Sequence, residues 1–141
     1  FGVFEHRVEV PTSAILRGFC DRVMIPVSRH TETRRTDLEA VDGITILLDS
    51  DEAGFCMAED APRRQIYMLN HLEYDARTLM DEYQRDVGEG LPIAVPRHYF
   101  PEDDPSREPP NSWRSHGHLF IGNWINQTYQ TSPFDLDLIG R

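Results

Sequence analysis

His71 and Glu73 are the two residues of this 141-residue chain whose types and spacing best suit catalysis. Because they stand two positions apart in an extended turn, their side chains point to the same side. The carboxylate is then placed to hold one imidazole nitrogen and to leave the other free as a base. Such a pair is two thirds of a catalytic triad and lacks a nucleophile. From spacing alone, a strand-end histidine held by a local carboxylate is an equally good interpretation.

A strand is predicted to lead into this pair, and a helix to leave it. The run 66–69 is short, apolar and bounded by polar residues, which predicts a strand buried on both faces. After it, Asp75 is placed to cap a helix and Gly88 to end it. The pair therefore stands at a strand-to-helix junction, where the connections of an open α/β sheet are free to shape a ligand site.

The segments before this unit favour a mixed α/β sheet within a single domain. A short helix is predicted at 36–41, where Thr36 and Glu39 have the spacing of a capping box. Several strands followed by one strand-helix unit are typical of a mixed sheet. The predicted strands are 3–10, 22–26, 44–48 and 55–58.

The segments after the unit are a long loop and a final helix. Residues 88–112 are rich in proline, yet they contain aromatic and apolar side chains that favour an ordered wrap over disorder. Residues 113–130 are predicted to form a terminal helix with one broad apolar face, capped by Ser112. Residues 1–141 are thus interpreted as one domain or part of one.

Composition excludes several classes of protein. A formal net charge of -10 leaves no basic face for nucleic acid, and no apolar run approaches the ~20 residues of a membrane span. The chain has no lysine, so it offers no side-chain amine for Schiff-base chemistry. Since no signal or anchor segment is visible, we expect a soluble protein of the cytoplasm.

Neither the cysteines nor the two neighbouring histidines predict a metal site. Cys20 and Cys56 fit no metal spacing. Neither lies on the elbow that exposes a nucleophile, so both are expected to be small buried residues. His116 and His118 point about 200° apart on a helix and cannot bind one ion together. No metal is therefore expected.

Ten short motifs follow one another along nearly the whole chain. They are Phe1-Gly-Val-Phe-Glu-His6, Leu16-Arg-Gly-Phe19, Pro26-Val-Ser-Arg-His-Thr-Glu32, Glu52-Ala-Gly54, His71-x-Glu-Tyr-Asp75, Glu82-Tyr-x-Arg-Asp86, Tyr99-Phe-Pro101, Asp103-Asp-Pro105, Trp113-Arg-Ser-His-Gly117 and Asn123-Trp124. Together they resemble the carboxyl-terminal half of the homoserine O-acyltransferases of methionine biosynthesis, the succinyl- and acetyltransferase family. The resemblance implies a flavodoxin-like three-layer α/β sandwich of the class I glutamine amidotransferase-like type, of which this chain is the later half.

The resemblance also implies roles for four residues. His71 is the catalytic base and Glu73 its catalytic partner, while Ser28 and Arg85 bind the substrate amino acid. The family's nucleophile is a cysteine that takes the acyl group from acyl-coenzyme A as a thioester. That cysteine and a substrate-binding lysine lie upstream of Phe1, so we expect a fragment or processed product that performs no acyl transfer alone. Acyl-coenzyme A is implied as a co-substrate, with no bound cofactor.

Two positions depart from the family pattern, and one distance is in tension with it. Val27 stands beside Ser28 where the family usually has histidine, which leaves the acceptor specificity open. Leu72 stands where the family often has proline. A straight helix starting at Asp75 would place Arg85 about 15 Å along it, so the helix must run beside the site.

The implied partners are small-molecule substrates, a second copy in a homodimer, and the chain's own amino-terminal half if the protein is cleaved. No nucleic acid or membrane partner is expected. Three other functions stay open: serine O-acyl transfer, glutamine amidotransferase-like hydrolysis, and non-catalytic binding by a truncated relative. The sequence does not choose between an acetyl and a succinyl donor.

Overall fold

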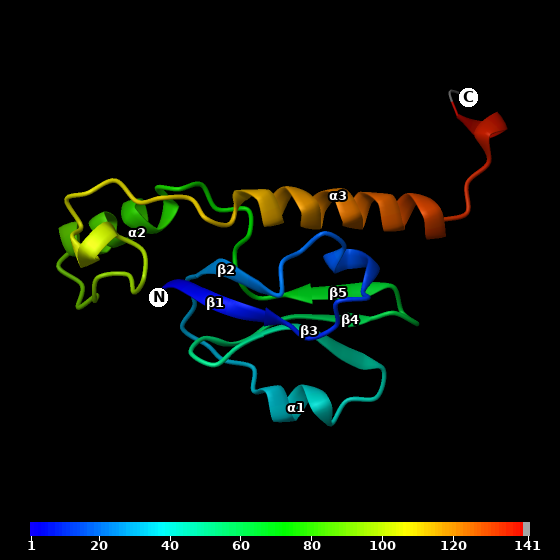
Figure 1. Cartoon of the computed structure of the whole chain (residues 1–141), viewed down its shortest axis with the longest axis horizontal. Coiled ribbons are helices and arrows are strands. Elements are labelled where there is room, and N and C mark those ends of the chain that lie inside the picture. Colours follow the sequence, from blue (N-terminus) through cyan, green and yellow to red (C-terminus); the bar gives the residue numbers. More distant parts are fainter. Residues whose placement is uncertain (140–141) are drawn as a thin grey trace.

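Five strands form one curled sheet, which positions the candidate residues (Figure 1). The computed structural model describes residues 1–139. The order across the sheet is β2-β1-β3-β4-β5, and each neighbouring pair is antiparallel. The strands are β1 (Gly2–Val8), β2 (Arg22–Val27), β3 (Ile44–Ser50), β4 (Gly54–Asp60) and β5 (Gln65–Met68).

Helices lie on both sides of the sheet. In Figure 1, α3 runs along one face and α1 lies beyond the opposite face, while α2 stands at one end. Within residues 1–139, no helix is long and apolar enough to cross a membrane. The helices are α1 (Arg35–Glu39), α2 (Thr78–Gly88) and α3 (Arg114–Thr131), with short 3-10 turns at Ala14–Leu16, Pro101–Asp103 and Leu136–Leu138.

The predicted α/β class is confirmed, but the predicted mixed sheet is wrong for the described strands. β3, β4 and β5 are joined by short connections, which link only antiparallel neighbours. The parallel pairing found in the described part of the chain is an isolated bridge between Gly2 and Arg97. The flavodoxin-like three-layer arrangement stays a prediction.

The sheet curls until its two edge strands approach each other. β1 pairs with β3 only at Arg7 and Val8, so the first half of β1 is free of β3. The chain that leaves β5 reaches β2, where the backbone N–H of His71 donates to the Pro26 carbonyl at 2.9 Å. Pro26 is tolerated inside β2 because this is an edge strand. The residues that follow β5 therefore meet those that follow β2.

β5 is a half-exposed edge strand, so the prediction of a strand buried on both faces is wrong. Ile66 and Met68 are partly buried, whereas Gln65 and Tyr67 are exposed. Since β5 has a neighbour on one side only, its alternate side chains face solvent. Tyr67 accounts for the error: its ring reads as apolar, but its hydroxyl donates to Gln65 on the exposed face.

α2 begins later than predicted. Its N-cap is Arg77, which makes no side-chain capping bond, and the first helical residue is Thr78. Asp75 contributes its carbonyl instead, which accepts from the Thr78 N–H at 3.2 Å. The residues between β5 and α2, numbers 69–77, are therefore a loop, called the junction loop below.

Two other predicted caps are also wrong. α1 has no side-chain cap, so the capping box at Thr36 does not form. α3 is capped from Asn111 rather than from Ser112. The Asn111 Oδ1 accepts from the backbone N–H of Trp113 at 3.2 Å and of Arg114 at 2.8 Å. An asparagine with two backbone donors in reach outcompetes a serine one position later.

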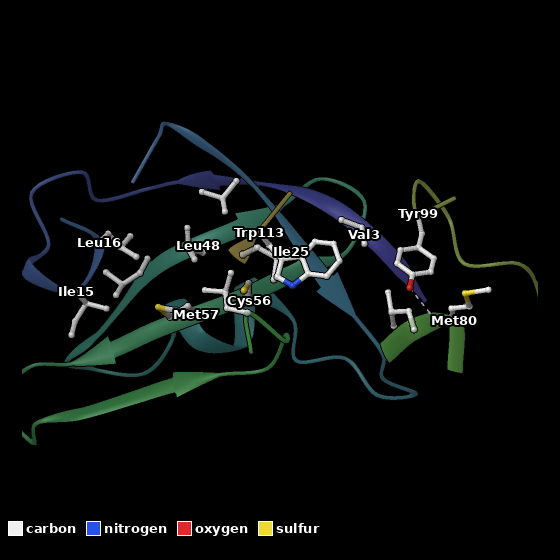
Figure 2. Close-up of a cluster of buried hydrophobic side chains, with 14 of the residues drawn as sticks. Val3, Ile15, Leu16, Ile25, Leu48, Cys56, Met57, Met80, Tyr99 and Trp113 are labelled. Atoms are coloured by element: carbon white, nitrogen blue, oxygen red, sulfur yellow. Dashed lines mark hydrogen bonds between the residues drawn. The ribbon is translucent and has the colours of Figure 1, made fainter. Parts of the chain in front are cut away.

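The core joins the sheet to segments that are far away in sequence (Figure 2). Side chains from the first four strands pack there with Tyr99 of the 88–112 loop and with Trp113. The Tyr99 hydroxyl accepts from the Met80 N–H at 3.1 Å and donates to the Ala76 carbonyl. The Trp113 Nε1–H donates to the Tyr74 carbonyl at 2.7 Å. These two anchors hold the junction loop and the start of α2.

The apolar face predicted for α3 is largely uncovered by residues 1–139. Within α3, Gly117 is the buried residue, and it packs against the junction loop. The exposed apolar residues of this helix are Leu119, Ile121, Trp124, Ile125 and Tyr129.

A buried histidine of β1 lies next to the junction loop. His6 is 0% exposed, with Nδ1 at 2.9 Å from the Phe4 carbonyl oxygen and Nε2 at 2.9 Å from the Asn70 Nδ2. Because a carbonyl only accepts, Nδ1 carries the proton and Nε2 accepts from the amide. Burial lowers the pKa of His6 to about 4, so the ring is neutral at pH 7.

His6 is expected to make the fold less stable in mild acid. Below its ordinary pKa of 6.5, an unfolded histidine binds a proton that the folded chain does not bind. Through this residue, the free energy of unfolding should drop by about 2 kcal/mol from pH 7 to pH 5, and further to about pH 4. Urea unfolding of wild type and His6→Gln at both pH values measures the difference. Equal drops in the free energy of unfolding of the two proteins would contradict the claim that His6 causes the loss of stability in acid.

Candidate active site

His71 and Glu73 form a hydrogen bond at the middle of the junction loop. His71 Nδ1 and Glu73 Oε1 are 2.7 Å apart. Since a carboxylate only accepts, the Nδ1–H donates and Nε2 is the nitrogen left with a lone pair. Within residues 1–139, Nε2 has no hydrogen-bond partner. The His71 side chain is 28% exposed and that of Glu73 is 65% exposed, so a substrate can reach the base.

Tyr74 connects His71 to a residue of α2 and lies near Ser28, which follows β2. Its ring stacks on the imidazole, with centroids 4.2 Å apart and planes 18° apart. Its hydroxyl donates to Glu82 Oε1 at 2.8 Å. Burial, and then the bond to Glu82, raise the pKa of Tyr74 to about 12, while the nearby Ser28 side chain acts in the opposite direction. The structure thus brings Ser28 and His71 to one cluster through a protonated tyrosine.

Glu82 is the residue of this cluster that the sequence analysis missed. One of its carboxylate oxygens, Oε1, accepts from Tyr74. The other, Oε2, is buried and has no partner among the described residues. An unpaired buried acceptor is costly, which makes Oε2 a natural acceptor for a charged donor on a ligand. The available signal was its position three residues before Arg85, on the same side of a helix.

Arg85 lies at the rim of the cluster rather than inside it. Its side chain is 62% exposed and pairs with Asp86, although Asp81 and Glu82 also stand at helical spacing from it. Because α2 begins at Thr78, Arg85 lies about 10 Å along the helix rather than about 15 Å. The later helix start therefore shortens the helical part of the path from the junction loop to Arg85.

The two departures from the family pattern are buried apolar residues. Val27 ends β2 and Leu72 lies in the junction loop, and each is 4% exposed. α3 packs directly on the backbone at Leu72: a Cβ placed on Gly117 would lie 2.6 Å from the Leu72 carbonyl oxygen. The absence of a side chain at Gly117 thus sets how closely the helix approaches the loop that carries His71.

Gly117→Ala is expected to disturb this packing, with Gly122→Ala as the matched control. Alanine favours a helix over glycine by about 1 kcal/mol at either position. At Gly122 nothing lies within 4 Å of the added Cβ, so stability should rise. At Gly117 the Cβ meets backbone, which cannot turn aside, and we expect a net loss of about 1–3 kcal/mol. Thermal unfolding compares the stability of the two variants. A gain in stability in Gly117→Ala would contradict the close approach of α3 to the Leu72 backbone.

A cavity of about 290 Å³ lies between the junction loop and α3. Its walls are mainly apolar, and Glu73, Arg114 and His118 contribute polar groups to them. Glu73 therefore borders a space large enough for a small ligand or for part of a larger one.

No activated thiol lies beside His71 in the described part of the chain. Cys56 is buried in β4, and burial raises the pKa of its thiol to about 12, so it is not a thiolate at pH 7. Cys20 is exposed, so the expectation of a buried residue is wrong at this position and holds only at Cys56. Cys20 also precedes β2, whereas Ser28 follows that strand, a separation of about 20 Å. Among residues 1–139, no three His, Cys, Asp or Glu side chains are grouped to hold a metal ion.

A family model and two curated relatives that match this chain all name homoserine O-acyltransferases. A family model described as homoserine O-succinyltransferase matches residues 1–134. Two curated relatives named homoserine O-acetyltransferase, from Cereibacter sphaeroides and Chelativorans sp. (strain BNC1), are each 55% identical over 141 residues. All of this chain is covered, but only 46% and 45% of the relatives, so it spans about half the length of the curated relatives it matches.

A solved structure supports the fold. The crystal structure of SMU.1228c superposes with a TM-score of 0.61, covering 92% of this chain and 52% of that one. The sequences are 12% identical, so the likeness concerns the fold alone.

Proposed function

This chain belongs to the homoserine O-succinyltransferase family, and on that basis we propose that it supplies the base and the acceptor-binding residues of a homoserine O-acyltransferase. The proposed donor is an acyl-coenzyme A. An acetyl donor is favoured over a succinyl one because the 55% identical relatives are named homoserine O-acetyltransferase. The observation that carries the proposal is the 2.7 Å bond from His71 Nδ1 to Glu73 Oε1, which leaves Nε2 as a base.

The proposed step is attack of the homoserine hydroxyl on an acyl thioester. His71 Nε2 takes the hydroxyl proton as the new C–O bond forms, and the Glu73 carboxylate stabilises the resulting imidazolium. The C–S bond then breaks, and the imidazolium returns the proton to the leaving thiolate. We propose that the thioester forms on a cysteine outside these 141 residues, because neither Cys56 nor Cys20 is an activated thiol beside His71.

Three residues are proposed to hold the acceptor amino acid. Its ammonium group donates to Glu82 Oε2, the buried oxygen that has no partner within residues 1–139. Its carboxylate takes two parallel bonds from Arg85, which leaves Asp86 to make them. The hydroxyl of Ser28, next to Tyr74, contributes a further polar contact. Tyr74 links two of these groups to the imidazole, because its ring stacks on His71 and its hydroxyl donates to Glu82.

The direct test is release of free coenzyme A. The full-length enzyme, meaning a chain of the relatives' length that carries these 141 residues, is mixed with acetyl-coenzyme A and homoserine. Release that requires homoserine is expected from it, and none from the 141-residue chain alone. Serine in place of homoserine tests the acceptor, and omission of any acceptor tests hydrolysis. A full-length enzyme that releases no coenzyme A, or does so equally without homoserine, would refute the proposal.

A further inference from the structure

We propose that His6 and Asn70 are positioning residues: their buried hydrogen bond fixes the junction loop and thereby the place of the His71 imidazole. The inference rests on the proposed function, because it takes His71 as the base. It concerns two residues with no chemical step of their own, one in β1 and one directly before His71.

Three consecutive residues tie the junction loop to three different strands. The N–H of Leu69 donates to the Cys56 carbonyl in β4 at 2.9 Å. The Asn70 side chain donates to His6 in β1, also at 2.9 Å. The N–H of His71 then donates to the Pro26 carbonyl in β2 at 2.9 Å. The middle bond is the one made by a side chain, and it crosses the sheet where β1 has separated from β3.

The direction of the middle bond is set by the histidine. His6 donates from Nδ1 to a carbonyl of its own strand, so Nε2 is its one acceptor and faces the Asn70 amide. His6 is 0% and Asn70 is 3% exposed, so bulk water cannot replace either partner. Asn70 Oδ1 is itself buried without a partner in the described residues, and the Cys56 thiol is a further polar group beside the Asn70 side chain. Loss of the bond between Asn70 and His6 leaves a buried polar group unpaired and removes the central of the three bonds that attach the junction loop to the sheet.

The effect on catalysis follows from sequence adjacency. His71 is the next residue after Asn70, and among the described residues its imidazole is held by Glu73 and by stacking on Tyr74, both in the same loop. A displaced loop therefore carries the whole group away from the acceptor. A misplacement of about 1 Å in a reacting group costs roughly 10²-fold in rate. Glu82 and Arg85 belong to α2, so the affinity for the acceptor should change little.

Two substitutions of His6 separate the two bonds. Glutamine places its amide near the former Nε2 and keeps an acceptor for Asn70. Asparagine places its amide near the former Nδ1, so it keeps the bond to Phe4 and loses the one to Asn70. In the full-length enzyme we expect His6→Asn and Asn70→Ala to lower kcat by about 10–100-fold, with KM for homoserine changed less than about threefold. His6→Gln should retain most of the wild-type kcat.

Hydrogen exchange supplies a readout that does not depend on activity. The His71 amide should exchange faster in His6→Asn and Asn70→Ala than in wild type or His6→Gln, while amides of the β3–β4 ladder stay protected in all four. Exchange raised across the whole sheet would show a general loss of folding in that variant. If His6→Asn unfolds in this way, Asn70→Ala is compared with wild type instead, and if Asn70→Ala does, His6→Asn is.

The outcomes distinguish this inference from the proposed function. If wild type is active and His71→Ala is not, a kcat in His6→Asn and Asn70→Ala equal to that of His6→Gln overturns the positioning role. If wild type is inactive or His71→Ala remains active, the proposed function fails. The exchange rate of the His71 amide then decides alone: equal rates in His6→Asn and His6→Gln refute the tether, and a faster rate in His6→Asn supports it.

Discussion

His71→Ala in the full-length enzyme is expected to lower kcat by about 10²–10⁴ while the free energy of unfolding changes little. The imidazole Nε2 is the base in the proposed step, since Nδ1 is engaged with Glu73. The side chain contributes little to the fold, because it is partly exposed and its hydrogen bond goes to the largely exposed Glu73. Activity and stability should therefore separate in this variant. Coenzyme A release and urea unfolding measure the two quantities on the same protein.

His98 offers the matched control for this substitution. It is also a histidine bonded to a carboxylate, with Nε2 at 3.2 Å from Glu52, and it lies outside the cluster around Tyr74. Its φ of 55° favours asparagine over alanine as the replacement, because asparagine adopts the left-handed region readily. His98→Asn should keep near wild-type turnover. Near-normal turnover in His71→Ala, or an equal loss in both variants, would remove His71 from the proposed mechanism.

The bonded pair of His71 and Glu73 is a local feature, which is why the sequence could predict it. A spacing of two residues is enough to bring His71 and Glu73 together, and their bond depends on no other part of the chain. The polar run after β2 is local too, and it contains Ser28. The meeting of the two is not local, since it depends on the bond from the His71 N–H to the Pro26 carbonyl, across the curl of the sheet. No periodicity in the sequence encodes that closure.

The errors in the prediction have the same origin. The short apolar run of β5 fits both a central and an edge strand, and the choice is made by the strand order, which places β5 last. Asp75 has the residue type of a cap, but the Tyr99 hydroxyl, from a loop over twenty residues later, bonds Ala76 and Met80 and holds the start of the helix at Thr78. Tertiary contacts thus decided the outcome wherever local signals were ambiguous.

Glu82 shows most clearly what a sequence cannot display. Its spacing to Arg85 on a helix is typical of a surface ion pair. In the structure Arg85 pairs with Asp86, and Glu82 turns to Tyr74 and leaves one buried oxygen unpaired. The feature that motivates the proposed ammonium contact is thus a missing partner, and only three-dimensional packing reveals it.

Glu82→Gln is expected to raise KM for homoserine by about 10–100-fold, the effect of losing a charged hydrogen bond of about 1.5–3 kcal/mol. Glutamine keeps an oxygen for the Tyr74 hydroxyl and is nearly the same size, so the fold should be retained. It has no charge with which to bind an ammonium group. KM for acetyl-coenzyme A should stay within about twofold of wild type, because the donor does not contact this oxygen in the proposed complex.

The proposed acceptor site also predicts that a substitution of Arg85 raises KM for homoserine and that a substitution of Asp81 leaves it unchanged. Arg85→Lys removes the planar fork that binds a carboxylate through two bonds, so KM for homoserine should rise again while KM for the donor does not. Asp81→Asn removes a carboxylate from the same helix at a position without an ion pair in the described residues, and is the control for the helix's charge. Steady-state kinetics with each substrate varied in turn distinguish the cases. If Glu82→Gln and Asp81→Asn shift KM for homoserine equally, the effect is one of general charge, and the unpaired oxygen of Glu82 is not the ammonium site.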